Sequence, residues 1–273
     1  MTIKTTRHGS YEDSRRLAVL IDADNAQPAV IEGLLAEVAK LGVASSKRIY
    51  GDWTSTAHAQ WKKALLEHSI TPVQQFAYTR GKNATDSSMI IDAMDLMYTR
   101  RFDGFCIVSS DSDFTRLAQR LREEGLIVYG FGERKTPEPF RSACDKFVYT
   151  ELLRATVVSD SSAPSPKPAA PAPVASPDAV ASAASNGAEN RGAEFPLELI
   201  RQAVRESTDD TGWAHLGAVG SYLTKLRPDF DSRSYGAAKL SDLLRGQSKH
   251  FLLEERGTPG VGSKPVYVQL KRP

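Results

Sequence analysis

A stretch dominated by alanine, proline and serine, from about Ala155 to Ala193, constrains the fold of this sequence more than any other feature. It contains almost no large apolar side chains, so burial cannot offset the conformational entropy that ordering it would cost. We therefore expect a disordered linker at 155–193 that is partly extended by its prolines. The linker separates two predicted domains, 16–153 and 194–273, and a chain of 273 residues is long enough for both.

Before the linker, short apolar runs alternate with amphipathic stretches. The runs suited to strands are 17–21, 47–50, 70–74, 104–108, 126–129 and 146–148. Helical spacing covers 30–41, 57–67, 86–98 and 114–124. This β-α alternation predicts an α/β domain in which helices cover both faces of a parallel sheet.

After the linker, the pattern changes to three amphipathic stretches and two extended runs. The expected helices are 196–206, 216–226 and 234–244, and the expected strands are 251–254 and 265–269. A segment rich in glycine and proline joins the two strands. Three helices followed by a β-hairpin are typical of a small winged-helix domain.

Acidic side chains follow the predicted strands of the first domain. Asp22 and Asp24 come directly after the first strand, and Asp111 and Asp113 come after a later one. Asp86 opens a predicted helix. Ligand sites of open α/β sheets form outside the carboxyl ends of the strands, so we expect the three segments to converge on one acidic pocket.

Such a pocket needs a cation, because clustered carboxylates repel one another. Mg²⁺ or Mn²⁺ suits a set of oxygen ligands completed by water. An ion of this kind can activate water and stabilise charge on a phosphodiester oxygen. The sequence has only two cysteines and five scattered histidines, so no cluster of soft ligands competes for a metal.

Each acidic residue also has an ordinary structural explanation. Asp113 could cap the helix that begins at Phe114, and Asp86 could favour its helix through the helix dipole. Asp24 and Asn25 could be turn residues. The occurrence of all three segments at the same predicted sheet edge favours the metal site.

Two further aspartates lie in the middle of the helix that Asp86 opens. Asp92 follows Asp86 by six residues, about 240° of helical rotation, so the two do not share a face. We treat Asp92 as a candidate support for the ligands and Asp95 as structural or solvated.

The acidic motifs resemble those of NYN domains, the PIN-like group that includes LabA-like proteins. The resemblance covers roughly Arg16 to Leu153 and rests on Asp-Ala-Asp-Asn at 22–25, Lys82 with Asp86, and Ser-Ser-Asp-Ser-Asp-Phe at 109–114. It implies a PIN-like fold and a metal-dependent ribonuclease. The residues it marks as metal-binding and catalytic are Asp22, Asp86, Asp111 and Asp113, with Asn25 positioning the pocket, the water or the substrate.

Several side chains near this edge are candidates for contacts with RNA. The basic ones in the first domain are Arg80, Lys82, Arg134 and Lys135. Ordinary solvated loop charge explains each of them equally well. Trp53 could stack on an unpaired base, although packing in the core or at its rim is the favoured role.

The second domain, about Glu194 to Leu270, resembles the OST-HTH or LOTUS domain. The matching segments are Phe-Pro-Leu at 195–197, Gly-Trp-Ala-His-Leu at 212–216, Tyr-Gly at 235–236 with Lys-Leu at 239–240, and Val-Tyr-Val at 266–268. Such modules occur joined to NYN domains. The resemblance implies RNA binding or, in some relatives, binding of a protein partner.

Candidate RNA contacts of this module lie on or beside the third helix and in the wing. They are Arg233, Lys239, Arg245, Lys249 and Lys264. Winged-helix proteins commonly place these elements on nucleic acid, and RNA would be met as a single strand or by its shape. A solvated basic face is the alternative, and nearby acids, Asp229 and Asp231 among them, offset part of the charge.

These features favour a Mg²⁺- or Mn²⁺-dependent ribonuclease that recruits RNA through its C-terminal module. A non-catalytic RNA-binding or regulatory adaptor that retains the fold is the alternative. A nucleotide-binding Rossmann enzyme is disfavoured, since no GxGxxG follows the first strand and no P-loop is present. We expect a soluble cytoplasmic protein, because no run approaches a membrane span and residues 1–16 lack an apolar signal segment.

Overall fold

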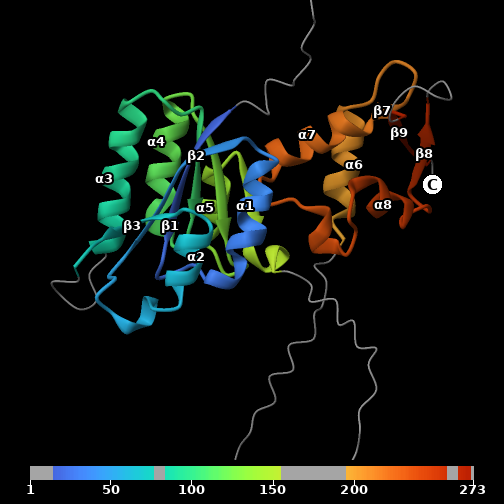
Figure 1. The fold of residues 1–273 in the computed structure, drawn as a ribbon. Coiled ribbons are helices and arrows are strands. Elements are labelled where there is room, and N and C mark those ends of the chain that lie inside the picture. Colours follow the sequence, from blue (N-terminus) through green and yellow to red (C-terminus); the bar gives the residue numbers. More distant parts are fainter. Residues whose placement is uncertain (1–14, 77–83, 155–194, 257–263, 272–273) are drawn as a thin grey trace, which may run out of the picture.

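The computed structural model of the chain describes residues 15–76, 84–154, 195–256 and 264–271 (Figure 1). The predicted linker at 155–193 lies outside the described residues. Two units are seen, a larger one that contains the long sheet and a smaller one that follows it in the sequence. No helix among the described residues is long and apolar enough to cross a membrane.

The larger unit is built on a parallel sheet of six strands in the order β3-β2-β1-β4-β5-β6. Every residue of β1 after Arg16 is buried, as expected for a parallel strand covered on both faces. The strands are β1 (Arg16–Asp22), β2 (Val43–Gly51), β3 (Thr71–Gln74), β4 (Gly104–Val108), β5 (Ile127–Gly132) and β6 (Lys146–Tyr149).

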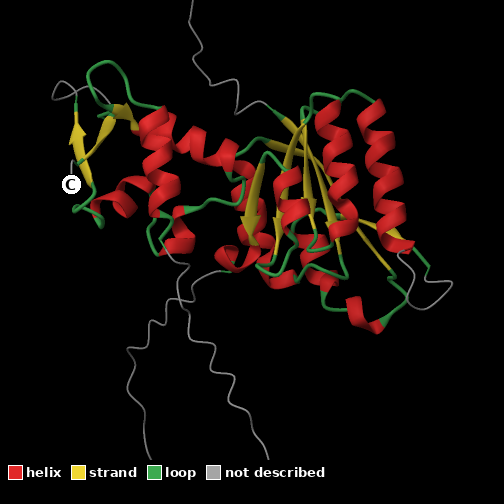
Figure 2. Ribbon diagram, turned by 180° about the vertical axis from the view of Figure 1, so that it is seen from behind, coloured by secondary structure: helices red, strands yellow, loops and turns green. Residues whose placement is uncertain are grey.

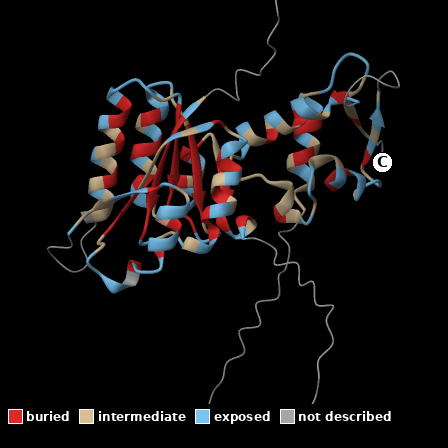
Figure 3. Ribbon diagram, in the orientation of Figure 1, coloured by how far each residue is buried: buried red, intermediate tan, exposed pale blue. Residues whose placement is uncertain are grey.

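Helices cover both faces of this sheet, and most of its strand residues are buried between them (Figures 2 and 3). Alternate residues of a strand pack against opposite faces. Ala18 and Leu20 of β1 pack with Met89 of α3, whereas Leu17 and Val19 pack with helices of the other face. The predicted α/β architecture is therefore confirmed. Helices α3 (Ala84–Tyr98), α4 (Thr115–Glu123) and α5 (Glu138–Ala143) cover one face, and α1 (Ile31–Ala39) and α2 (Trp61–Glu67) cover the other.

The strand order creates a switch point between β1 and β4. The chain runs from β1 outward to β2 and β3, then α3 returns it across the sheet to β4, from which it continues outward through β5 and β6. The loops after β1 and β4 therefore diverge at the carboxyl edge. Ligands of open α/β sheets bind at such a crevice.

The smaller unit has a core of its own, formed by residues such as Ile200, Val219, Leu244 and Phe251. Three helices pack on an antiparallel sheet of order β7-β9-β8, as the sequence predicts for a winged-helix domain. Its elements are α6 (Leu197–Glu206), β7 (Ala214–His215), α7 (Leu216–Leu226), α8 (Leu240–Arg245), β8 (Phe251–Glu255) and β9 (Val266–Leu270).

The third helix of this unit is shorter than the predicted 234–244. A 3₁₀ turn, Ser232–Tyr235, precedes it and is separated from α8. Asp231 caps the turn by accepting a hydrogen bond from the Arg233 amide, and Gly236 ends it with a φ of 81°. Glycine adopts this left-handed conformation without steric cost, so the sequence Tyr-Gly stops the helix that periodicity alone would continue.

The two units contact each other directly. The Phe147 amide of β6 donates a hydrogen bond of 2.9 Å to the Pro228 carbonyl oxygen. Arg141 and the Tyr149 hydroxyl both donate to the Asp229 carboxylate. Asp229 and Pro228 belong to the smaller unit, so the structure adds a polar interface to the linker that the sequence predicts.

A second charged contact completes the interface. Arg233 of the smaller unit donates to Glu37 of α1 over 3.3 and 3.4 Å, and Lys40 and Lys146 also pair with Glu37. The Glu37 side chain is buried. Burial raises its pKa, but the hydrogen bond from Lys40 and the charges of Arg233 and Lys146 outweigh burial and leave the pKa below its usual value.

Candidate metal centre

Three carboxylates meet at the carboxyl edge, where the switch point lies. Asp111 and Asp113 follow β4, and Asp86 lies in the first turn of α3. One oxygen from each of the three lies within 4.8 Å of the others. Three carboxylate oxygens so close together match the ligands of a hard divalent cation such as Mg²⁺ or Mn²⁺.

Asp22, at the end of β1, is buried beside this cluster and tied down by hydrogen bonds. Its Oδ2 accepts from the Ser109 hydroxyl over 2.9 Å and from the Asn25 amide group over 2.7 Å. Its Oδ1 accepts from the Asp24 backbone N–H over 3.0 Å. The hydrogen bond from Asn25 therefore orients the Asp22 carboxylate. Asp22 itself is not one of the three close carboxylates.

Ser109 links the two loops of the switch point. Its Oγ donates to Asp22 and accepts from the Asp111 backbone N–H over 3.1 Å. Asp111 in turn accepts from the Asp113 backbone N–H over 2.9 Å and caps the 3₁₀ turn Ser112–Phe114. The capping role that we considered for Asp113 thus falls to Asp111.

Burial and neighbouring carboxylates raise the pKa of Asp86 and of Asp22. Burial, followed by the charges of Asp22, Asp111, Asp113 and Asp24, raises the pKa of Asp86 from 3.8 to about 6. Burial also raises the pKa of Asp22, against the opposing hydrogen bonds from Asn25, Ser109 and Asp24. A divalent cation would remove this repulsion, so the electrostatics fit the metal that the donor set suggests.

His58 stands next to the cluster, and sequence reasoning missed it. Its Nε2 lies 3.2 Å from Asp24 Oδ1, and its ring packs against Trp53 with centroids 5.5 Å apart. A Cβ at Gly51 would lie only 3.3 Å from the His58 Nε2, so glycine leaves room for the ring. His58 ends a short 3₁₀ turn, Thr56–His58, and lies within the stretch 57–67 that is predicted to be helical. Helical spacing does not indicate that its ring approaches Asp24, and the helix itself begins only at Trp61.

Trp53 has a structural role in this loop. Its indole N–H donates to the Val73 carbonyl oxygen over 3.0 Å, and its ring packs against the core of the α1 face. Asp92 is likewise placed away from the cluster, since it accepts hydrogen bonds from Arg48, at 2.6 Å for Oδ2, and from Tyr50. Asp92 joins α3 to β2, and Asp95 is exposed.

The predicted basic contacts of the larger unit are dispersed. Arg80 and Lys82 lie outside the described residues. Arg134 sits over the Tyr149 ring at 5.3 Å, and the exposed Lys135 pairs with Glu133 at 2.8 Å. A cavity of about 190 Å³ beside the cluster is lined by Asn25, Ser109 and, as its one basic residue, Arg154, which sequence reasoning did not select.

The predicted basic contacts of the smaller unit fall into two groups. Arg233 and Arg245 are paired with acids, Arg233 at the interface and Arg245 with Asp242 and Glu255. Lys239, Lys249 and Lys264 are exposed, and Lys239 lines a groove of about 610 Å³ between α7 and α8.

An aromatic group on the small sheet also went unpredicted. The Arg256 guanidinium stacks 4.5 Å from the Trp213 ring and 4.8 Å from the Tyr267 ring. Its neighbours on the sheet include His215, whose ring lies 5.4 Å from Tyr267.

Two family models match the chain. The model described as NYN domain matches residues 16–153, and the model described as OST-HTH/LOTUS domain matches residues 193–262. Each match falls on one of the two units. No curated protein matches the chain.

Two solved structures resemble parts of the chain. A solution NMR structure of an uncharacterized protein from Nitrosomonas europaea shares 42% identity, covering 42% of this chain and 93% of its own, with a TM-score of 0.28. A crystal structure of a protein of unknown function from Vibrio parahaemolyticus shares 18% identity, covering 51% of this chain and 95% of its own, with a TM-score of 0.43. Both TM-scores are below 0.5, and we draw nothing further from them.

Proposed function

The chain belongs to the NYN domain family, and we propose that it is a metal-dependent ribonuclease that hydrolyses RNA phosphodiester bonds. The convergence of Asp86, Asp111 and Asp113 within 4.8 Å carries this proposal. The arrangement is not needed for folding, because it places carboxylates together at a site where burial and the neighbouring charges raise the pKa of Asp86 to about 6.

Asp86, Asp111 and Asp113 would hold Mg²⁺ or Mn²⁺, and Asp22 would complete the negative environment. When bound, the ion supplies Lewis acidity toward water and toward a phosphodiester oxygen. Asp22 contributes a carboxylate whose position is fixed by Asn25 and Ser109. Because Ser109 also holds the Asp111 backbone, the loops after β1 and β4 are kept in register.

The smaller unit would recruit the RNA, since it matches the OST-HTH/LOTUS family. Lys239, Lys249 and Lys264 are exposed and pair with no acid among the residues that the structure describes, so they can contact phosphates without breaking such a pair. Arg233 and Arg245 would have to break ion pairs to do the same. We therefore assign the main contacts to the three lysines.

Incubation of the purified protein with mixed RNA and DNA, in Mn²⁺, Mg²⁺ or EDTA, tests the proposal. We expect RNA cleavage in either metal and none in EDTA. Asp22→Asn and Asp111→Asn should each reduce the rate about a hundredfold or more, because both remove charge that the cation requires. Asp95→Asn is the matched control, as Asp95 is exposed on α3 outside the cluster.

Cleavage that persists in EDTA and in both variants would refute a metal-dependent aspartate site. RNA binding without cleavage in any metal would instead identify the chain as an RNA-binding adaptor that retains the family fold.

A further inference from the structure

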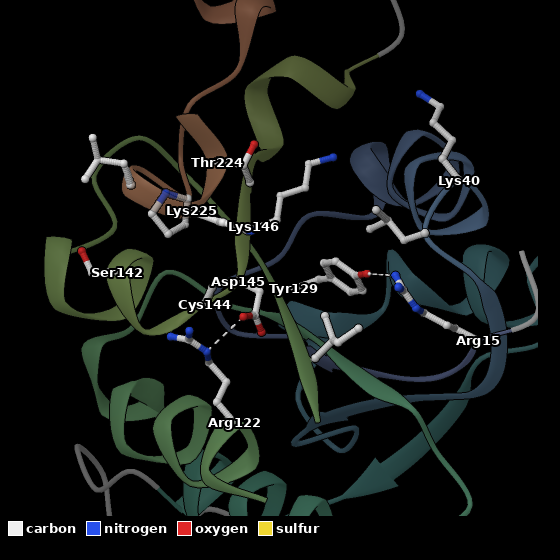
Figure 4. A pocket seen from close by; sticks show the side chains of 14 residues that line it. Arg15, Lys40, Arg122, Tyr129, Ser142, Cys144, Asp145, Lys146, Thr224 and Lys225 are labelled. Atoms are coloured by element: carbon white, nitrogen blue, oxygen red, sulfur yellow. Dashed lines mark hydrogen bonds and ion pairs between the residues drawn. The ribbon is translucent and has the colours of Figure 1, made fainter. Parts of the chain in front are cut away.

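A cavity of about 630 Å³ lies between the two units, at the amino edge of the large sheet (Figure 4). Arg15 precedes β1, Lys146 begins β6, and Arg122 lies in the last turn of α4. Lys225 comes from the last turn of α7 in the smaller unit. Lys40, after α1, completes the basic lining. We call this space the interdomain cavity.

The interdomain cavity is separate from the candidate metal centre. The aspartates follow the carboxyl ends of β1 and β4, whereas the cavity is lined by residues at the opposite ends of the strands. Strands of this length separate the two edges by about 20 Å. A ligand of the cavity therefore does not contact the aspartates.

Positive charge is in excess around the interdomain cavity. Five cationic side chains line it, and Asp145, which pairs with Arg122 at 3.1 Å, is the one acidic residue of the lining. Glu37 stands nearby and pairs with Lys40, Lys146 and Arg233. Lys225 has no acidic partner among the described residues.

The ends of nearby helices account for part of this charge. Helices α1, α4, α5 and α7 all end beside the cavity, and each C-terminus carries the equivalent of up to about half a negative charge. These four ends, together with Asp145, Glu37 and Asp231, leave an excess of about one positive charge once Arg233 is counted with the cavity cations. Helix-end stabilisation alone does not explain the lining.

The lining is also partly apolar. Leu41, Ile127, Leu226 and Pro228 contribute carbon surface, and the Tyr129 hydroxyl accepts a hydrogen bond of 3.3 Å from Arg15. A volume of this size is in the range of small-ligand sites. An apolar wall beside a cationic rim suits a ligand with a flat ring at one end and a phosphate at the other.

We propose that the interdomain cavity binds a nucleoside phosphate, with the phosphate on the cationic rim that both units supply and the base against the apolar wall. The same chemistry is offered by a free nucleotide and by a segment of single-stranded RNA. This proposal does not depend on ribonuclease activity. Because Lys225 belongs to the smaller unit and Lys146 to the larger, the ligand would bridge the two.

Lysine footprinting on the full-length protein tests the proposal and locates the site. The protein is acylated in EDTA, alone or with adenosine, adenosine 5′-monophosphate or a short single-stranded RNA, and lysine modification is mapped by mass spectrometry. We expect the monophosphate, the RNA or both to protect Lys225 and Lys146, and adenosine to protect neither. Lys62 of α2, exposed and distant from the cavity, serves as the internal control.

The two ligands identify the source of the phosphate. Protection by the monophosphate supports a free nucleotide, and protection by the RNA alone supports an RNA segment. Lack of protection by both, or equal protection of Lys62, overturns the proposal. EDTA prevents metal-dependent cleavage, so the result stands apart from that of the nuclease experiment.

A charge-reversal variant gives a second, independent readout. Lys225→Glu should weaken binding of the protecting ligand about tenfold, since it replaces a cation–phosphate contact with repulsion. Lys62→Glu makes the same charge change elsewhere and should leave affinity unaltered. Equal affinities of the two variants would overturn the proposal, and Lys225→Ala replaces the Glu variant if that one does not fold.

Discussion

Asp86 and Asp229 are both partly buried carboxylates, but their surroundings move their pKa values in opposite directions. The neighbours of Asp86 are other aspartates, and its pKa rises to about 6. Burial also raises the pKa of Asp229, but the hydrogen bond from Tyr149 and the charges of Arg227 and Arg141 outweigh burial and lower it. Burial of an acid therefore does not distinguish a ligand site from a structural contact, whereas the presence of a compensating cation in the protein does.

Removal of the compensation at Asp229 should produce the largest change in stability. Arg141→Ala leaves Asp229 buried without its closest cation, and we expect docking of the two units to weaken by about 2 kcal/mol. Exchange of the Phe147 amide, which donates to Pro228, should then accelerate by about thirtyfold.

Arg227→Ala is the matched control for this variant. Arg227 also pairs with Asp229, but over 3.5 Å and with half of its side chain exposed. Its removal should change docking by less than about 1 kcal/mol. If the two variants accelerate exchange of the Phe147 amide equally, the less exposed ion pair with Arg141 stabilises Asp229 no more than the exposed one with Arg227 does.

Removal of the repulsion at Asp86 should have a smaller effect of opposite sign. The folded protein binds a proton at Asp86 more tightly than the unfolded chain does, so metal-free stability should fall as pH rises from about 4 to about 6 and stay lowered above that. Asp86→Asn removes this loss. After allowance for solvent screening, we expect a gain of about 1 kcal/mol at pH 7 in EDTA.

Denaturant unfolding in EDTA at pH 7 and at pH 4 measures this gain. The difference between Asp86→Asn and the wild type should shrink at pH 4, where Asp86 is protonated in the folded state. Asp95→Asn, on the exposed side of the same helix, should show no such pH dependence. A variant less stable than the wild type at pH 7 would show that Asp86 is compensated after all.

The smallest expected effect concerns two exposed lysines of the smaller unit, Lys239 and Lys249. Lys239→Ala and Lys249→Ala should each reduce the slope of log affinity for single-stranded RNA against log salt by about 0.7, if each contacts one phosphate. Arg245→Ala should change the slope less, because Arg245 is already paired with Asp242 and Glu255. Equal slopes for all three variants and the wild type would favour a protein partner for this module.

The sequence predicts the sheet and the position of its acids because both follow from local rules. Burial of both faces makes a parallel strand an apolar run, and parallel strands bring Asp22 and Asp111 to one edge. Ser109 lies two residues before Asp111, but its bond to Asp22 can be expected only once β1 and β4 are known to be neighbours. His58 lies within the predicted helical stretch 57–67, but helical spacing does not show that it meets Asp24, and this approach depends on tertiary packing.

The interface between the units was beyond the reach of sequence reasoning for a different reason. Asp229 and Arg233 look like ordinary surface charges in a polar segment, and we interpreted Arg233 as an RNA contact whose charge nearby acids such as Asp229 partly offset. Their partners, Glu37 and Arg141, are separated from them by the linker and by much of the larger unit. No spacing rule connects residues so far apart in the chain.

The hydrogen bond between the Phe147 amide and the Pro228 carbonyl has a consequence for solubility. Strand β6 is an outer strand of the sheet, and its exposed N–H groups would form a template for pairing with another chain. The smaller unit covers this edge, and a proline carbonyl accepts the bond without extending a strand. A chain cut within 155–193 and freed of the smaller unit would leave the Phe147 N–H on an open edge, where strands of separate molecules can join and aggregate.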